Sequence, residues 1–280
     1  MILIADSGTT KTAWCAISDT GATEKTTTSG INPFYQDSEN IAAILRNEFP
    51  FNHRFKAVYF YGAGCINEEK QNAVKVGLSH VIEVENYFIG SDLLAAAHSL
   101  CQTRPGIACI LGTGSNSCYY NGSEIVANVS PLGFILGDEG SGAVLGKKLI
   151  SDILKKQLPR VLIDDFFATY ATTPAEILEN VYKRPFPSRY LAGYTKFLSK
   201  NIGYFEIENL VKSGFHDFLI RNLLQYPEIK NIPVHFTGSI AYYFEAQLRQ
   251  VIEGHHLKMG KIEQAPLEGL IQYHQNKIIL

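Results

Sequence analysis

The sequence has little of what marks membrane, secreted or nucleic-acid-binding proteins. The formal net charge of its 280 residues is −2 at pH 7, whereas nucleic acids and anionic membranes are bound by basic patches. Apolar runs stay well short of the roughly 18 residues that cross a bilayer. The start, Met1–Ile4, lacks the basic segment of a signal peptide. We therefore expect a cytoplasmic protein that binds neither nucleic acid nor a membrane.

Cysteine is scarce as well, and its spacing argues against metal and redox motifs. The five cysteines are an odd number, with no CxxC pair and no ligand-like Cys/His spacing. Most of them lie in or beside apolar stretches, where a thiol behaves as a small buried hydrophobe. The sequence thus predicts buried free thiols in a reducing compartment rather than disulfides or metal ligands. The cysteines are Cys15, Cys65, Cys101, Cys109 and Cys118.

Two stretches of the chain share one pattern, in which an apolar run breaks into a turn of small residues and then resumes. Residues 2–5 lead into Asp6–Thr12, and residues 107–111 lead into Gly112–Ser117. Glycine lets such a turn bend sharply and approach a ligand closely. The N–H groups and hydroxyls of the turn can bind an anion. The two stretches therefore predict two halves of the protein that bind one polyphosphate.

The remaining pattern predicts an α/β protein with ample core, since 46% of the residues are hydrophobic and 19% charged. Strands that precede helices indicate parallel pairing in a covered sheet. Polar residues around Gln102–Gly106 mark a boundary between two domains. Strands are expected at 2–5, 12–18, 24–28, 57–61, 81–84, 107–111, 116–121, 124–129 and 233–236. Helices are expected at 39–49 (capped by Ser38), at 68–78 (capped by Asn67), from 91, through Leu145 to Leu154, over much of 159–226, and from 240 to near 252.

Five motifs in this order resemble the N-acetylglucosamine kinase branch of the actin-like ATPase superfamily. They are also similar to the ATPase family that contains the activators of benzoyl-CoA reductase and 2-hydroxyacyl-CoA dehydratase. The resemblance spans residues 2 to about 250, and the motifs are Asp6–Thr12, Gly90–Asp92, Leu111–Asn116, Gly137–Gly142 and Thr237–Ser239. It implies two actin-like (ribonuclease H-like) α/β domains that flank a nucleotide and sugar cleft. Their expected bounds are 1–104 and 105–280, the second with a helical insertion and with its last helix packed back on the first domain.

The expected cofactors are ATP and Mg²⁺. Asp6 ends a strand, and its carboxylate can face a metal ion held between phosphates, because Mg²⁺ prefers a few carboxylates plus waters and phosphate oxygens. The alternative for Asp6 is a residue that caps a turn. Thr10 and Thr113 would bind phosphate, or simply favour strands, and Lys11 would neutralise charge or face solvent. The full set of candidate cofactor-binding residues is Asp6, Gly8, Thr9, Thr10, Lys11, Gly112, Thr113, Gly238 and Ser239, with Asp6 as the metal ligand.

Asp92 is the candidate general base. It opens a helix after a strand, where the helix dipole favours a charged carboxylate, and phosphoryl transfer needs a group that takes the proton of the acceptor hydroxyl. The alternative is an ordinary aspartate at a helix start. By resemblance, the sugar is bound near Asp92 by Asn32, Gly114, Ser115, Asn116, Gly133 and Asp138. For Asn32 the alternative is a turn residue before proline, and for Asp138 it is a helix cap.

Together these features predict ATP-dependent phosphorylation of an amino sugar or related hexose, with N-acetylglucosamine or glucosamine as the first candidates. Two other functions stay open. An activator ATPase would hold an iron–sulfur cluster between subunits, yet this chain has Leu93–Ala96 where cysteines would be needed. A sensor would bind sugar or nucleotide without turnover. The sequence leaves the oligomeric state open, although resembling proteins commonly form homodimers through their helical half.

Overall fold

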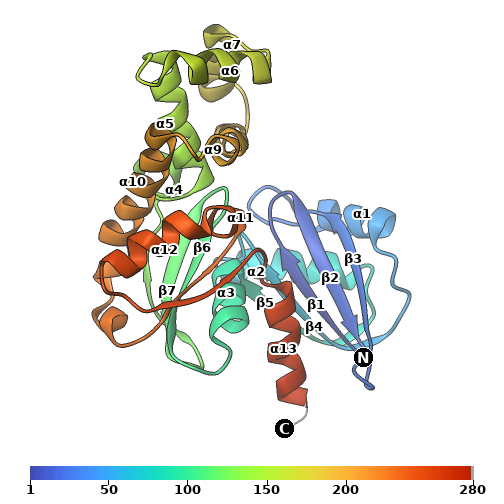
Figure 1. Ribbon diagram of the computed structural model, residues 1–280. Helices are drawn as coiled ribbons and strands as arrows, with labels where there is room; N and C mark the ends of the chain where they lie inside the picture. The colour runs from blue at the N-terminus through green and yellow to red at the C-terminus, as the bar shows by residue number, and fades with distance from the viewer. Residues whose placement is uncertain (279–280) are drawn as a thin grey trace. The chain divides into compact units, whose positions relative to one another are not determined.

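The computed structural model describes residues 1–278 and divides the chain into two compact units. The first unit comprises Met1–Arg104 together with the C-terminal segment that begins at Ala265, and the second comprises Pro105–Gln264. The last two residues of the expected domain 105–280 lie outside the described part. Each unit contains a five-stranded mixed sheet covered by helices (Figure 1). The α/β class predicted from the sequence is therefore confirmed.

The sheet of the first unit has the order β3-β2-β1-β4-β5. Its central strand β1 pairs antiparallel with β2 and parallel with β4. The parallel register sets Asp6 beside Tyr61 and Tyr61 beside Gly90, so the carboxyl ends of β1, β4 and β5 share one edge. The strands are β1 (Ile2–Ser7), β2 (Lys11–Ile17), β3 (Thr23–Ser29), β4 (Phe55–Gly62) and β5 (Val84–Ser91).

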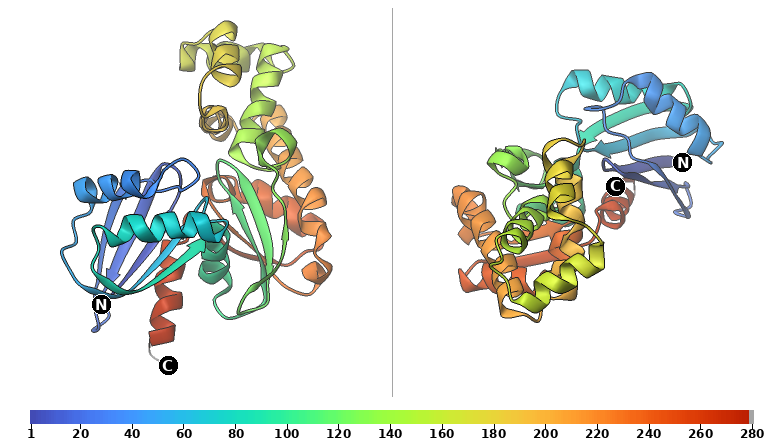
Figure 2. Two further views of the ribbon diagram at one scale, coloured as in Figure 1. Left: turned by 180° about the vertical axis from the view of Figure 1, so that it is seen from behind. Right: turned by 90° about the horizontal axis from the view of Figure 1, so that it is seen from above.

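Alternate residues of β1 enter two different cores, because successive side chains of a strand point to opposite faces. Leu3 and Ala5 pack in the core beneath α1 (Ser38–Glu48) and α2 (Glu68–Ser79). Ile2 and Ile4 pack on the other face, toward α3 (Asp92–Cys101) and α13 (Leu267–Ile278). Figure 2 shows α1 and α2 together on one face of the sheet. With both faces covered, β1 is a continuous apolar run that delivers Asp6 to the sheet edge.

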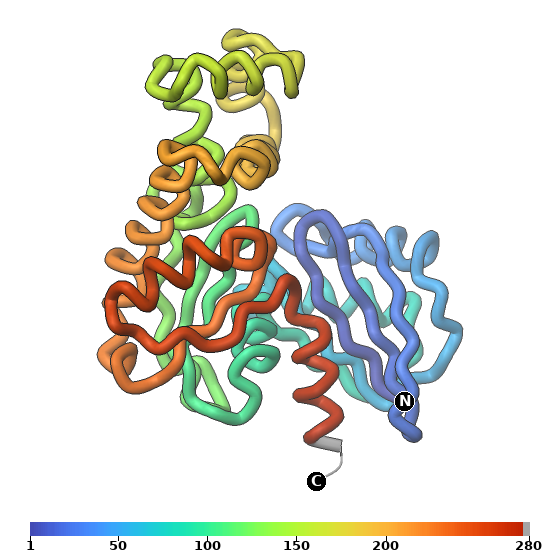
Figure 3. Tube along the Cα trace, viewed as in Figure 1, coloured from blue at the N-terminus to red at the C-terminus, as the bar shows by residue number. Residues whose placement is uncertain are grey.

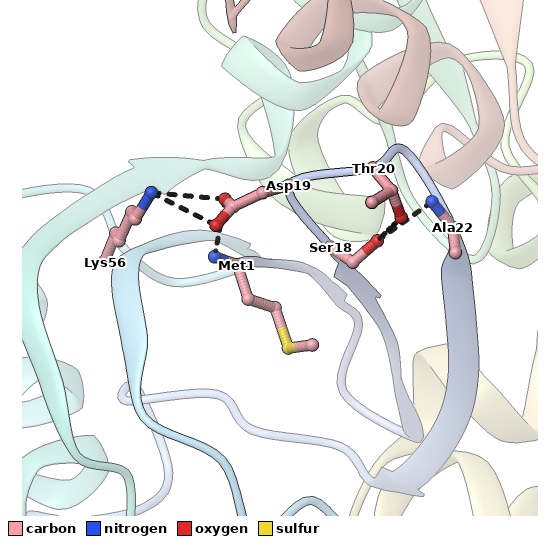
Figure 4. Close-up of polar contacts among 6 residues, drawn as sticks. All are labelled: Met1, Ser18, Asp19, Thr20, Ala22 and Lys56. Atoms are coloured by element: carbon pink, nitrogen blue, oxygen red, sulfur yellow. Dashed lines mark hydrogen bonds and ion pairs between the residues drawn. The ribbon is translucent and has the colours of Figure 1, made fainter.

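The opposite end of this sheet is held by a polar cluster around Asp19 (Figure 4). Its carboxylate accepts hydrogen bonds from the N-terminal ammonium group, at 2.9 Å, and from Lys56 Nζ, at 3.2 and 3.3 Å. Ser18 Oγ lies 2.8 Å from Thr20 Oγ1 and accepts a bond from the Ala22 N–H. The N-terminal ammonium group and Lys56 lower the pKa of Asp19. The cluster fixes the turn between β2 and β3 at the end of β1 that is remote from Asp6.

The sheet of the second unit has the order β10-β9-β6-β7-β8, with β6 at its centre. Ile107, Cys109 and Leu111 of β6 belong to a large core shared with α5, α10 and α12. β6 pairs antiparallel with β7 and parallel with β9, as β1 does with β2 and β4. The elements are β6 (Gly106–Leu111), β7 (Ser115–Tyr120), β8 (Ile125–Val129), β9 (Val234–Thr237), β10 (Met259–Glu263), α5 (Gly142–Leu154), α10 (Phe205–Arg221) and α12 (Glu245–Gly254).

A helical segment is inserted between α5 and α10 of the second unit, and Figure 3 traces it in green to orange. Within it α8 packs on α5, and Thr173 and Glu176 form a capping box at the start of α7. The helices of this segment are α6 (Arg160–Tyr170), α7 (Pro174–Tyr182), α8 (Pro187–Gly193) and α9 (Thr195–Lys200). Shorter elements lie outside it, namely α4 (Gly133–Leu136), α11 (Ser239–Tyr243), η1 (Leu223–Gln225) and η2 (Pro227–Lys230).

Two local predictions from the sequence are wrong, and one strand was missed. The strand expected at 81–84 is instead β5, because the N–H groups of Val81 and Ile82 close the last turn after α2 on the Leu78 carbonyl. Asp37 rather than Ser38 caps α1, since its carboxylate accepts the Asn40 N–H at 2.9 Å. β10 was not predicted, because its residues lack the β-branched and aromatic character of a typical strand.

The cysteine prediction is confirmed, since all five thiols are free and buried. In residues 1–278 no helix combines the length and the apolar character that crossing a bilayer requires.

Candidate active site

The chain that follows β3 packs against the turn between β1 and β2. The Gly8 N–H donates to the Lys11 carbonyl at 3.0 Å and closes the turn. A Cβ on Gly30 would overlap the Gly8 carbonyl oxygen and the Thr9 carbonyl carbon, so only glycine permits this close approach. Thr9, Thr10 and Lys11 remain exposed. The turn is therefore fixed on one side and presents hydroxyls and one ammonium group on the other.

Asn32 is buried beside this turn. Its Nδ2 donates to Thr9 Oγ1 at 3.3 Å, and its Oδ1 accepts the Phe34 N–H at 2.9 Å. Gly64 has φ +83° and lies so close that a Cβ there would overlap Asn32 Oδ1. Asn32 thus serves partly as a turn residue, as the alternative interpretation of the sequence held, and it also contacts the predicted phosphate turn.

Asp6 and Asp92 lie at the carboxyl ends of β1 and β5, with β4 between them. The register across β4 sets Asp6 level with Gly90, and Asp92 follows Gly90 by two residues, at the start of α3. Burial, together with the charge of Asp92, raises the pKa of Asp6 to about 7, although Lys11 opposes both effects. Burial also raises the pKa of Asp92, although the Leu93 N–H, which donates to Asp92 Oδ1 at 2.9 Å, lowers it. Desolvation therefore outweighs the helix start that was expected to favour the charged form of Asp92.

This pair suits a cation that is shared with phosphates. A carboxylate whose ionised form is disfavoured by burial and by a like charge is stabilised when a cation binds. Groups of three or more His, Cys, Asp or Glu side chains that could hold a metal ion do not occur in the part of the chain described. Mg²⁺ does not need such a cage, because it binds one or two carboxylates and keeps waters and phosphate oxygens. Asp6 fits that donor set.

The turn between β6 and β7 in the second unit is held by the start of α5. The Gly112 N–H donates to the Gly114 carbonyl at 2.9 Å. The carbonyl oxygens of Gly112 and Thr113 accept the N–H groups of Gly142, at 2.8 Å, and Ala143, at 3.0 Å. These two oxygens, which would repel a phosphate, are therefore turned toward the helix.

A cavity of about 520 Å³ opens beside this turn within the second unit. Its size is that of a small-molecule site, and its wall is largely apolar with a few polar groups, as such sites usually are. Gly238 braces the wall, because it has φ +109° and packs directly against the Leu111 carbonyl. The cavity is lined by Gly112, Thr113, Arg189, Ala192, Gly193, Thr195, Lys196, Ser199, Ser239, Ile240, Tyr243 and Phe244.

Sequence reasoning identified part of this wall and missed the rest. It identified Gly112, Thr113 and Ser239 but gave no signal for Arg189 and Lys196, which lie on α8 and α9. An aromatic run such as 242–244 usually packs a helix against its neighbours. That holds for Phe244, which is buried, whereas Tyr243 is 60% exposed and lines the cavity.

A second polar group forms around Asp138. Asp138 has φ +52°, and its N–H donates to the Pro131 carbonyl at 2.8 Å. Its carboxylate accepts the Ser115 N–H at 3.2 Å and lies so close to Gly114 that a Cβ there would be 3.0 Å from Oδ2. Burial raises the pKa of Asp138, and the Ser115 N–H opposes this. The fold thus brings together Gly114, Ser115 and Asp138.

Other residues of these motifs have different surroundings. Asn116 Oδ1 accepts bonds from the Ser117 N–H and from Asn128 Nδ2, each at 2.9 Å, which tie it to its own sheet. Gly133 begins α4 with φ +73°. Glu139 pairs with Arg221 at 2.6 Å and accepts Asn222 Nδ2 at 3.2 Å, so it anchors α10.

Comparisons with known proteins agree with this architecture. No known protein-family profile and no curated protein sequence matches the chain. A solved structure from Porphyromonas gingivalis, named "Putative N-acetylglucosamine Kinase", is 47% identical, with a TM-score of 0.90 and 99% of each chain covered. A protein of the same name from Chromobacterium violaceum is 16% identical, with a TM-score of 0.76, and 97% of this chain and 98% of that chain are covered.

More distant structures share the fold alone. A glucokinase from Streptomyces griseus, solved with glucose and AMPPNP, is 15% identical, with a TM-score of 0.54 and 98% of each chain covered. The MreB 5 protein of Spiroplasma citri, solved with AMPPNP, is 13% identical, with a TM-score of 0.53, and 98% of this chain and 95% of that chain are covered. The predicted actin-like fold is confirmed.

Proposed function

The chain belongs to the family of the Porphyromonas gingivalis protein, a branch of the actin-like ATPase superfamily, and from that premise we propose that it is an ATP-dependent sugar kinase. The acceptor is an amino sugar or related hexose, with N-acetylglucosamine first and glucosamine second. The observation that carries the proposal is the pair Asp6 and Asp92 at one sheet edge, beside a braced turn of small residues. That arrangement combines a metal ligand, a phosphate-binding turn and a base.

Asp92 is the proposed general base. The acceptor oxygen attacks the γ-phosphorus, the bond from that phosphorus to the β,γ-bridging oxygen breaks, and the hydroxyl proton passes to the Asp92 carboxylate. The raised pKa supports this role, since a base works best when its pKa approaches the operating pH.

The ATP phosphates are proposed to be bound by the two turns. In the first unit Gly8, Thr9, Thr10 and Lys11 supply N–H groups, hydroxyls and one positive charge, and Asp6 would hold Mg²⁺. When bound, that ion neutralises charge on the transferring phosphoryl group. In the second unit Gly112 and Thr113 bind phosphate, and Gly238 and Ser239 support the nucleoside. The support for this half is that Thr113 and Ser239 line one cavity of nucleoside size.

The sugar is proposed to be bound by short polar groups with fixed positions. Asn32 and Asp138 are each held by hydrogen bonds to their surroundings, so they lose little freedom when they bind hydroxyl groups. Burial raises the pKa of Asp138, and its carboxylate can accept hydrogen bonds from sugar hydroxyl groups. The remaining proposed contacts are Gly114, Ser115, Asn116 and Gly133.

A coupled assay of ADP release tests this function over a panel of hexoses and amino sugars, with a control that lacks sugar. We expect ADP release to depend on sugar and to be fastest with an N-acetylated or free amino sugar. An activator ATPase would be indicated by two results together: a rate of ATP hydrolysis that no sugar changes, and a high iron content in anaerobically purified protein. Sugar and ATP binding without any turnover would indicate a sensor.

Asp92→Asn tests the proposed base. The variant should lose about 10²-fold or more in kcat, the usual effect of removing a positioned base, while ATP and sugar still bind. Glu68→Gln is the matched control, since Glu68 opens α2 as Asp92 opens α3 and is exposed. Parental turnover by Asp92→Asn would show that another group takes the proton.

A further inference from the structure

The cavity of the second unit carries positive charge that a neutral nucleoside does not require. Arg189 and Lys196 both line it, and its lining includes no acidic residue. Two other cations on the same helical segment are paired, Lys200 with Asp165 at 3.2 Å and Arg184 with Glu179 at 2.6 Å. In the described residues 1–278, by contrast, no carboxylate lies within 4.0 Å of the charged nitrogens of Arg189 or Lys196. Two cations on one cavity wall thus have no protein counter-ion.

We propose that Arg189 and Lys196 bind the phosphate group nearest the ribose, so that the second unit selects nucleoside phosphates over nucleosides. This rests on the proposed function, because it takes the cavity as the nucleotide site. Arginine and lysine form strong charge-assisted hydrogen bonds with phosphate oxygens. Two neighbouring cations without an anion repel each other, and a bound phosphate relieves that repulsion.

The surroundings of the two cations favour phosphate over the base as their ligand. Arg189 already lies over the Phe186 ring, with its guanidinium carbon 5.1 Å from the ring centroid. One of its faces is therefore occupied by an aromatic ring, while its N–H groups remain directed along the guanidinium plane. The apolar part of the cavity wall, which suits the base, is formed by Ile240, Phe244 and the exposed ring of Tyr243. The phosphate joined to the ribose necessarily stays near such a base.

The test compares ligands that differ only in their phosphates. Calorimetric titration would measure adenosine, AMP and ADP binding to the parent, to Lys196→Met and to Arg189→Met, without sugar. Each variant should bind AMP and ADP roughly five- to tenfold more weakly, which is the order expected for a lost charge-assisted bond at an exposed site. Adenosine affinity should not change. Added salt should weaken AMP binding to the parent more than to the variants, because exposed charge pairs are screened.

Lys200→Met is the matched control, since Lys200 lies four residues from Lys196 on α9 but pairs with Asp165 instead. It should bind AMP as the parent does. An equal loss of adenosine affinity in Lys196→Met and Arg189→Met would overturn the proposal in favour of a contact with the base. Unchanged AMP affinity in both variants, or an equal loss in Lys200→Met, would overturn it too.

The outcomes also separate this inference from the proposed function. If the parent phosphorylates a sugar while both variants bind AMP like the parent, the inference fails and the kinase stands. If the variants lose AMP affinity as expected but the parent turns over no sugar, the inference stands and the kinase assignment fails. A parent that binds no adenine nucleotide refutes both.

Discussion

Gly238→Ala is expected to destabilise the second unit and to disturb its cavity. Gly238 has φ +109°, and a Cβ there would overlap the Leu111 carbonyl oxygen and carbon and lie 3.2 Å from the Gly112 nitrogen. All three atoms belong to the backbone, so no side chain can rotate away. With ψ 158° as well, Gly238 occupies a backbone region that is almost restricted to glycine, which costs another residue about 1–3 kcal/mol, and overpacking costs about 1–3 kcal/mol. The free energy of unfolding should therefore fall by about 2–6 kcal/mol.

Urea unfolding measures this change, and the KM for ATP reports whether the strain reaches the turn at Gly112. Gly203→Ala is the control, since it makes the same substitution in the same unit at a position where a Cβ has nothing within 4 Å. It should leave both the unfolding midpoint and the KM near the parental values, whereas Gly238→Ala should lower the midpoint and raise the KM. Equal midpoints for the two variants would refute the argument that backbone overlap requires glycine at 238.

Two further predictions concern pH. Because burial raises the pKa of Asp6 from 3.8 to about 7, its ionised form destabilises the fold by an amount that grows above pH 3.8 and levels off above 7. Asp6→Asn should therefore raise the free energy of unfolding at pH 8 by at most about 4 kcal/mol and not at pH 4, as urea unfolding at both pH values would show, while kinase activity falls. Burial lowers the pKa of His235 from 6.5 to about 4, so the parent should lose about 2 kcal/mol of stability between pH 7 and pH 5. His235→Gln should lose less over that range, and the exposed His216→Gln as much as the parent.

The two hairpins were predictable because each strand that precedes a turn is buried on both faces. In β1 the alternate residues enter cores on opposite faces of the sheet, so the strand appears as an unbroken apolar run. The turn then stands out by its glycines and hydroxyls. β5 lacks this contrast. It lies at the sheet edge, and exposed Glu85 and Asn86 break its apolar pattern, so the apolar residues just before it were mistaken for the strand.

The wall of the cavity was predictable only where glycines form part of a recognisable turn. Gly238 stands out because few residues tolerate its close contacts and conformation, whereas Gly112, where a Cβ would meet nothing within 4 Å, stands out through the glycine-rich stretch around it. Arg189 and Lys196 do not stand out, because cations at such positions of a helical segment usually face solvent. Their significance depends on α8 and α9 lying beside the turn of a distant strand. The bond from Ser115 to Asp138 is hidden for the same reason, since a left-handed residue in a loop creates it.

The electrostatics of the two units differ in a way that suits a triphosphate with a metal ion. In the first unit burial and the charge of Asp92 raise the pKa of Asp6, and Lys11 opposes this only in part, so that unit attracts a cation more readily than a bare phosphate. The cavity of the second unit has cations on its wall and no carboxylate among its lining residues, so it attracts an anion without help. A metal ion bound to the terminal phosphates would neutralise the carboxylates of the first unit, while the phosphate next to the ribose would neutralise the cations of the second. Under the proposed function, the different charges of the two units suit different parts of one ATP molecule.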